Sequence, residues 1–189
     1  MEIKIGIKFI KTVIALALLL FLSYRLYQYL KPVETIFIKN VSFSFREDVR
    51  KALKVEASPN EEVLYKLFTD YDMKNVTILF KPGTPETNAL YQIETFEIVY
   101  KLSKYDNSFR GFRPKKTFNA EEIESYGNIT REEGVLKIIL IPPEFSNQTR
   151  VTGGGNRIWI YGKTDKGFDA AVVKAVLSMM NVTNIEGYV

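Results

Sequence analysis

The sequence contains no cysteine and no histidine. Without cysteine there is no disulfide framework, no thiol nucleophile and no cysteine metal site. Without histidine, the Ser-His-Asp and Cys-His catalytic arrangements are impossible, as are histidine zinc ligands. Only carboxylate, lysine, tyrosine or serine chemistry remains, and the Asp and Glu residues occur in capping or surface patterns. We therefore predict a protein that is not an enzyme and has no catalytic, cofactor-binding or metal-binding residues.

A basic field is also absent from most of the chain, although the net charge is +4. Residues 1–31 carry five bases and one acid, which account for the whole net charge. The 21 bases and 21 acids of residues 32–189 balance each other. Because a domain that binds a nucleic-acid duplex needs a basic field of its own, we exclude nucleic acid as a partner.

Residues 5–24 form an apolar run that is long enough to cross a hydrocarbon core of about 30 Å. Its basic flank is N-terminal, so we expect the N-terminus to stay in the cytoplasm and the rest of the chain to lie outside. A cleaved signal peptide is the alternative, but bulky and charged residues follow the run. Only Lys8 and Lys11 interrupt the run, near its first end, and Tyr24, Tyr27 and Tyr29 lie near the other end.

This pattern predicts two parts: a cytoplasmic N-terminus with a transmembrane signal anchor over residues 1–31, and an extracytoplasmic globular domain over residues 32–189. The predicted location is therefore the cell membrane, as a single-pass protein with its C-terminal domain outside the cytoplasm.

Five N-x-[ST] sequons follow the predicted anchor and none precedes it. Composition alone predicts roughly 1.3 such motifs. Their glycosylation would require an extracytoplasmic domain, in agreement with the predicted topology. The alternative is that Asn and Thr simply favour loops and strand ends. The candidate glycosylation sites are Asn40, Asn75, Asn128, Asn147 and Asn181.

Hydrophobic periodicity predicts an α+β (mixed α/β) fold, in which a two-layer domain of about five strands and three to four helices packed on the sheet follows the transmembrane helix. The last helix has the strongest signal, because its apolar residues repeat at helical spacing from Phe168 to Met180 and Thr164 or Asp165 can cap it. The predicted strands cover residues 35–45, 76–80, 91–102, 135–141 and 157–161. The other predicted helices cover residues 47–54, a segment capped by Ser58, and residues 119–126.

Residues 109–116 mix aromatic and basic side chains, which is the composition of a patch for an anionic polymer or a lipid headgroup. A solvated hairpin is the alternative, since Glu121, Glu122 and Glu124 follow nearby. The candidate interaction residues are Phe109, Arg110, Phe112, Arg113, Lys115 and Lys116.

Residues 162–164 read Gly-Lys-Thr between a strand and a helix, as in a phosphate-binding loop. The full motif needs a glycine five residues earlier, where this chain has Arg157. We therefore predict a tight turn and a helix cap instead of a nucleotide site. Residues 152–156 are rich in glycine and predict a flexible loop tip.

Residues 156–181 read NRIWIYGKTDKGFDAAVVKAVLSMMN. This stretch resembles the ending of archaeal single-pass membrane-anchored cell-surface or envelope proteins of unknown function. The matching residues are Gly162, Thr164, Phe168, Ala171 and Val172. The resemblance implies an archaeal envelope context, and it transfers no catalytic residue.

The leading functional hypothesis is a membrane-anchored, non-catalytic structural or protein-interaction module of the cell envelope, with other envelope or membrane proteins as partners. The alternative is an accessory or assembly subunit of a larger membrane protein complex. A third hypothesis is an extracytoplasmic hydrolase that uses carboxylates, which would need two acids across a cleft.

Overall fold

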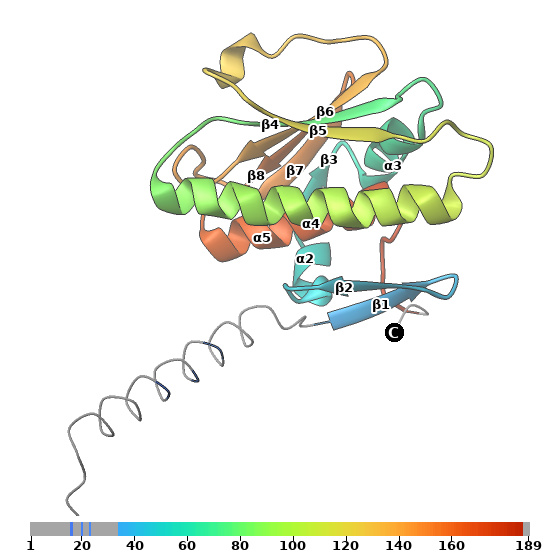
Figure 1. Cartoon of the computed structure of the whole chain (residues 1–189), viewed down its shortest axis with the longest axis horizontal. Helices are drawn as coiled ribbons and strands as arrows, with labels where there is room; N and C mark the ends of the chain where they lie inside the picture. Colours follow the sequence, from blue (N-terminus) through green and yellow to red (C-terminus); the bar gives the residue numbers. More distant parts are fainter. Residues whose placement is uncertain (1–15, 17–19, 21–22, 24–33, 187–189) are drawn as a thin grey trace, which may run out of the picture.

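The computed structural model describes residues 34–186 and three single positions before them, Leu16, Leu20 and Ser23. In this part of the chain a mixed six-stranded sheet carries its helices on one face, and a two-stranded hairpin lies on the far side of those helices (Figure 1). The structure is thus an α+β domain with three layers, where the sequence predicted two. The third layer is the hairpin.

The sheet has the strand order β3-β7-β8-β6-β4-β5. All neighbouring strands are parallel except β7 and β8, which form an antiparallel pair. The central strand β6 is apolar along almost its whole length, as expected for a strand covered on both faces. The bounds are β3 (Glu56–Ser58), β4 (Asn75–Phe80), β5 (Thr117–Glu122), β6 (Val135–Ile141), β7 (Arg150–Gly154) and β8 (Arg157–Tyr161).

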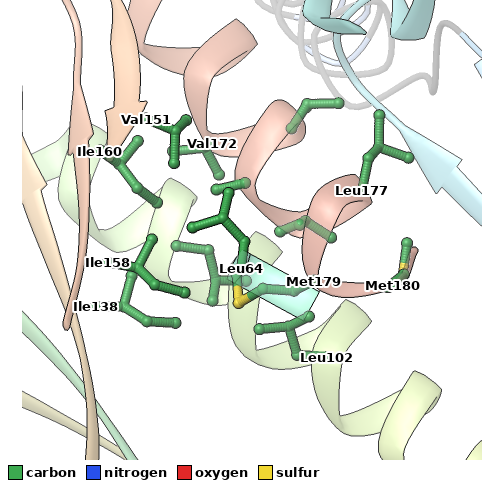
Figure 2. Close-up of a cluster of buried hydrophobic side chains, with 14 of the residues drawn as sticks. Leu64, Leu102, Ile138, Val151, Ile158, Ile160, Val172, Leu177, Met179 and Met180 are labelled. Carbon is green, nitrogen blue, oxygen red and sulfur yellow. The ribbon is translucent and has the colours of Figure 1, made fainter. Parts of the chain in front are cut away.

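The C-terminal helix α5 (Asp165–Met179) lies between the sheet and the hairpin and is surrounded by the other helices. These are α2 (Val49–Leu53), α3 (Glu61–Thr69) and α4 (Pro85–Phe109). Figure 2 shows Val172 pointing toward Val151 and Ile160 of the sheet, whereas Leu177 points away from the sheet. From Ala171 to Met180 every residue of this segment is buried. The sequence predicted one apolar stripe here, and the structure buries all sides of the helix.

The hairpin consists of β1 (Glu34–Ile38) and β2 (Val41–Phe45). Lys39 and Asn40 form its two-residue turn with φ values of 45° and 69°, the left-handed conformation that such turns require. Phe43 packs against Tyr105 of α4, with ring centroids 6.5 Å apart. The prediction of one strand over residues 35–45 was therefore wrong, because this turn reverses the chain.

The opposite face of the sheet carries a small second core. Leu79, Ile139 and Ile141 are buried there beneath the connections that follow β5 and β6. Among the residues packed on them are Phe145 and Trp159. This face is covered by loops and by the short 3₁₀ helix η1 (Tyr126–Asn128).

Within the described residues, no helix is long and apolar enough to cross a membrane. By this finding the prediction of a membrane-spanning helix as part of the fold was wrong. The segment to which it was assigned, residues 5–24, lies outside the described residues except at Leu16, Leu20 and Ser23.

The prediction of a strand over residues 91–102 was also wrong, because this segment is the middle of α4. Thr84 caps the helix by accepting a hydrogen bond from the backbone N–H of Thr87, and Pro85 occupies its first turn. The alternation of apolar residues from Phe96 to Leu102 had favoured a strand. Tertiary packing favours the helix instead, because the side of α4 that includes Tyr91 and Leu102 is buried.

Three smaller predictions also need correction. Residues 119–126 were expected to be helical, but β5 occupies the first half of this segment because it pairs with β4 along its whole length. Asn60, not Ser58, caps α3, since its side chain accepts from Val63 N at 3.0 Å. The predicted loop tip over residues 152–156 begins inside strand β7, because Arg150–Gly154 pairs with β8. The strands over 76–80, 135–141 and 157–161, the short helix within 47–54 and the Thr164 cap are confirmed.

Gly162 allows β8 to pass directly into α5 and gives a first test of this packing. A Cβ atom at this position would lie 2.8 Å from the backbone nitrogen of Phe168, so Gly162→Ala forces the helix start to move. We expect a loss of about 1–3 kcal/mol in the free energy of unfolding, measured by urea denaturation. Gly154→Ala is the matched control, because no atom lies within 4 Å of the added group. Equal stability of the two variants would contradict this account of the turn.

Candidate functional site

Two large aromatic side chains on α4 point into solvent. Phe96 and Tyr100 are 69% and 53% exposed, and they occupy positions i and i+4 of the helix. Their rings are nearly parallel, with an interplanar angle of 10° and centroids 5.8 Å apart. We call this pair the α4 ridge. Its stacking limits the rotamers of both side chains, so the ridge is a preformed surface.

Hollows lie on both sides of the α4 ridge. The hollow between α4 and β5 has a volume of about 550 Å³, and Tyr91, Val99 and Ala120 contribute to its walls. A second hollow of about 450 Å³ lies between α4 and the hairpin, next to Ser44. Phe96 lines both of them. The ridge therefore separates two apolar depressions that can receive side chains of a partner.

The floor of the hollow between α4 and β5 is held by a chain of hydroxyl groups. Tyr91 and Tyr126 are linked through their hydroxyl oxygens at 3.1 Å, and Tyr126 donates to the carbonyl of Leu140 at 2.9 Å. Burial is the main reason why the pKa of both tyrosines lies above its ordinary value. Tyr91 also packs on Phe80, with ring centroids 5.0 Å apart. The hollow thus has a rigid and uncharged floor.

Strand β5 forms the outer wall of this hollow and is the last strand of the sheet. Thr117 and Ile123 donate their backbone N–H groups to β4 or the residue before it, at 3.0 and 2.9 Å. Backbone groups alternate in direction along a strand, so those of Phe118, Ala120 and Glu122 point away from β4. No strand of residues 34–186 pairs with this outer edge.

The carboxyl ends of the parallel strands are the usual ligand position in open α/β sheets. In this protein a side chain of the same chain, Glu144, occupies the N-terminus of α4 at that edge of the sheet. Glu144 accepts hydrogen bonds from Thr84 N at 3.1 Å and from the Thr87 hydroxyl at 2.7 Å, at the N-terminus of α4. These bonds lower the pKa of Glu144, because they favour the charged carboxylate. The N-terminus of α4 is therefore not open to an external anion.

An acid pair, the buried Glu94 and the half-buried Asp169, joins α4 and α5. The side chains of Glu94 and Asp169 are hydrogen-bonded. Burial first, and then the negative charge of Asp169, raise the pKa of Glu94 to about 9. Burial also raises the pKa of Asp169, but its hydrogen bond with Glu94 acts in the opposite direction. Glu94 is thus the protonated donor, and Asp169 is the acceptor.

This pair does not have the arrangement of a glycosidase acid pair, in which the carboxyl groups lie roughly 5–9.5 Å apart across a cleft. Glu94 and Asp169 are in direct hydrogen-bond contact, and neither lines the two hollows beside the ridge. Next to them Glu97 and Lys101 form a buried ion pair, with the Lys101 ammonium 4.7 Å from the centroid of Phe45. These charges join α4 to α5 and to the hairpin.

The six predicted interaction residues do not form one exposed patch. Phe109 packs on Tyr105 with centroids 5.0 Å apart, Arg110 ends α4, and Arg113 donates to the carbonyls of Arg110 and Thr69, both at 3.1 Å. Lys116 is buried, and its ammonium donates to the carbonyls of Asp70 and Met73. Phe112 and Lys115 remain exposed. Binding of an anion by these residues stays a prediction.

The five sequon asparagines are all exposed, but their glycosylation also stays a prediction. They lie on different parts of the domain: the hairpin turn, the start of β4, the end of η1, the connection between β6 and β7, and the segment after α5. In this order they are Asn40, Asn75, Asn128, Asn147 and Asn181. Within the described residues no group of three or more acids can hold a metal ion.

Sequence reasoning missed the α4 ridge because it placed Phe96 and Tyr100 in a strand. One signal could have found it: Thr84-Pro85 is a helix start, and an aromatic pair four residues apart then faces one direction. No protein-family model matches the chain, and no curated protein or solved structure matches it significantly. The function must therefore be argued from the site, since an α+β fold by itself assigns none.

The acid pair predicts a pH dependence of stability. Between pH 4.5, the ordinary pKa of glutamate, and about 9, Glu94 retains a proton in the folded state that the unfolded chain releases. The stabilisation is complete below pH 4.5 and is lost as the pH rises toward 9, with a slope of up to about 1.4 kcal/mol per pH unit. Glu94→Gln keeps a neutral donor for Asp169 and removes this titration.

Urea unfolding at pH 5, 7 and 9 measures the difference. We expect the stability of the native protein to fall more steeply with pH than that of Glu94→Gln. The exposed Glu133→Gln serves as the control and should follow the native curve. Parallel curves for the native protein and Glu94→Gln would show that Glu94 is not protonated in the folded state.

Proposed function

We propose that this protein is a non-catalytic protein-interaction module that binds its partner through the α4 ridge and the adjoining edge of β5. The observation that carries this proposal is the stacked and exposed pair Phe96 and Tyr100 between two apolar hollows. Large exposed aromatic groups next to hollows mark protein-binding sites, and tyrosine is enriched among residues that dominate binding energy.

The energetics favour a partner that covers the ridge. Burial of a phenylalanine side chain contributes roughly 1.5–3 kcal/mol, which is not realised while Phe96 is exposed. The two rings are already stacked, so their side chains lose little conformational freedom on binding. Gln92 and Ser103 are polar neighbours along the helix and can form the rim of such an interface.

An accessory subunit of a larger complex would use the same surface with a different partner. A carboxylate hydrolase is less well supported, because Glu94 is buried and interacts directly with Asp169, and neither residue lines the two hollows. The experiment for the proposal should therefore report which chain lies against the ridge.

A photo-crosslinking residue at Gln92, which is exposed beside both hollows, tests this interface in cells that naturally express the protein. We expect one discrete adduct, whose mass identifies the partner. Phe96→Ala combined with Tyr100→Ala should reduce the adduct yield about tenfold or more, because it removes the central apolar contacts.

Phe112→Ala is the matched control, since Phe112 is fully exposed but lies outside the ridge and its hollows. The proposal fails if position 92 gives no discrete adduct. It also fails if the double variant and Phe112→Ala retain the adduct equally.

A further inference from the structure

The two edges of the sheet differ in how they are protected. Strand β3 at one edge has only three residues and is followed by Pro59. Strand β5 at the other edge has six residues, contains neither proline nor glycine, and is exposed at every position except the half-buried Phe118. A long edge strand without such protection is a template for pairing with another strand.

The free backbone groups of β5 define where such pairing begins. The N–H of Lys116 is occupied, because it donates to Asp106 Oδ2 at 3.1 Å. From Phe118 onward, every second residue directs its backbone groups outward, and within residues 34–186 no strand receives them. The open run therefore centres on Asn119 and Ala120.

The charged residues around β5 determine whether a second copy of this strand would pair with it in parallel or in antiparallel orientation. The exposed Lys115 precedes the strand, whereas Glu121 and Glu122 end it and Glu124 follows. Parallel pairing of two copies would place like charges together. Antiparallel pairing places the basic start of each strand beside the acidic end of the other, which is favourable.

We propose that a second copy of this chain pairs with β5 in antiparallel orientation, around a two-fold axis at Asn119. Phe118 then exchanges backbone hydrogen bonds with Ala120 of the second copy, so outward groups meet outward groups. Thr117 lies opposite Glu121 of the second copy, and Lys115 is a diagonal neighbour of the same carboxylate. An axis at Ala120 would instead make the two copies of Glu121 diagonal neighbours.

This arrangement explains both exposed features at once. A two-fold axis at Asn119 runs perpendicular to the sheet, so the helices of both copies lie on the same face of one continuous sheet. The α4 helices then lie side by side across the axis, and each α4 ridge faces the other copy. The inference rests on the proposed function, because it names the partner of the same surface.

Cysteine trapping tests the axis directly, because the natural chain contains no cysteine. In an antiparallel pair without mutual hydrogen bonds, opposite Cα atoms lie about 4.5 Å apart, within the range that a disulfide spans. Full-length Asn119→Cys should therefore form a covalent dimer under mild oxidation. Thr117→Cys and Glu121→Cys should each stay uncrosslinked alone, and a mixture of the two should crosslink.

Sedimentation measurements test the same interface without oxidation. The natural full-length chain should be a dimer, and Glu121→Lys should weaken its dimerisation about tenfold or more, because Lys115 then faces a like charge. Combining Glu121→Lys with Lys115→Glu restores opposite charges and should restore the dimer. Both residues are exposed, so we expect these variants to keep the fold, which thermal unfolding measures.

The proposal is overturned if the natural chain is monomeric and Asn119→Cys does not crosslink, or if only Ala120→Cys does. The proposed function has its own outcome in the photo-crosslinking at position 92. An adduct with another protein there, together with a monomeric chain, refutes self-pairing and leaves the interaction module intact. An adduct of two copies of this chain supports both, and no adduct at all refutes the interaction module.

Discussion

The burial of α5 on all sides is the constraint on which the rest of the structure depends. A helix between the sheet and a second layer needs apolar residues around its whole circumference, and from Ala171 to Met180 this chain supplies them at all but two positions. Ser178 is a buried polar exception, and Lys174 is a buried charged one. Its ammonium donates to the Leu53 carbonyl at 3.0 Å and to Glu61 at 2.6 Å, so the buried charge is paired.

The packing of α4 on α5 determines which side of α4 is exposed to solvent. The inner side of α4 packs on the sheet and on α5 with Tyr91, Ile98 and Leu102, and a second side meets the hairpin through charged groups such as Lys101. The outer side is left with Phe96 and Tyr100. Because α4 connects β4 to β5, it also places β5 at the sheet edge directly beside that ridge. The exposed helix side and the exposed strand edge are therefore parts of one surface.

Some of this architecture could be read from local sequence, and some could not. The strands around Ile78, Ile139 and Ile160 were predictable because short apolar runs bounded by turn residues describe buried strands. The segment around Phe96 was assigned to a strand because its apolar residues also alternate, and alternation over few residues does not separate strand from helix. Strand β5 was not predicted, because Asn119 and Glu122 match the capping pattern of a helix start. Only its pairing with β4 identifies this segment as an edge strand.

The sequence by itself determined the absence of thiol and imidazole chemistry, the balanced charge of residues 32–189 and the last helix with its Thr164 cap. These properties depend on composition and on contacts between near neighbours. Only the tertiary structure decided that Glu94 meets Asp169, that Lys116 is buried and that Phe96 is exposed beside β5. Each of these depends on which distant segments pack together, and the free energy of that packing outweighs local propensity.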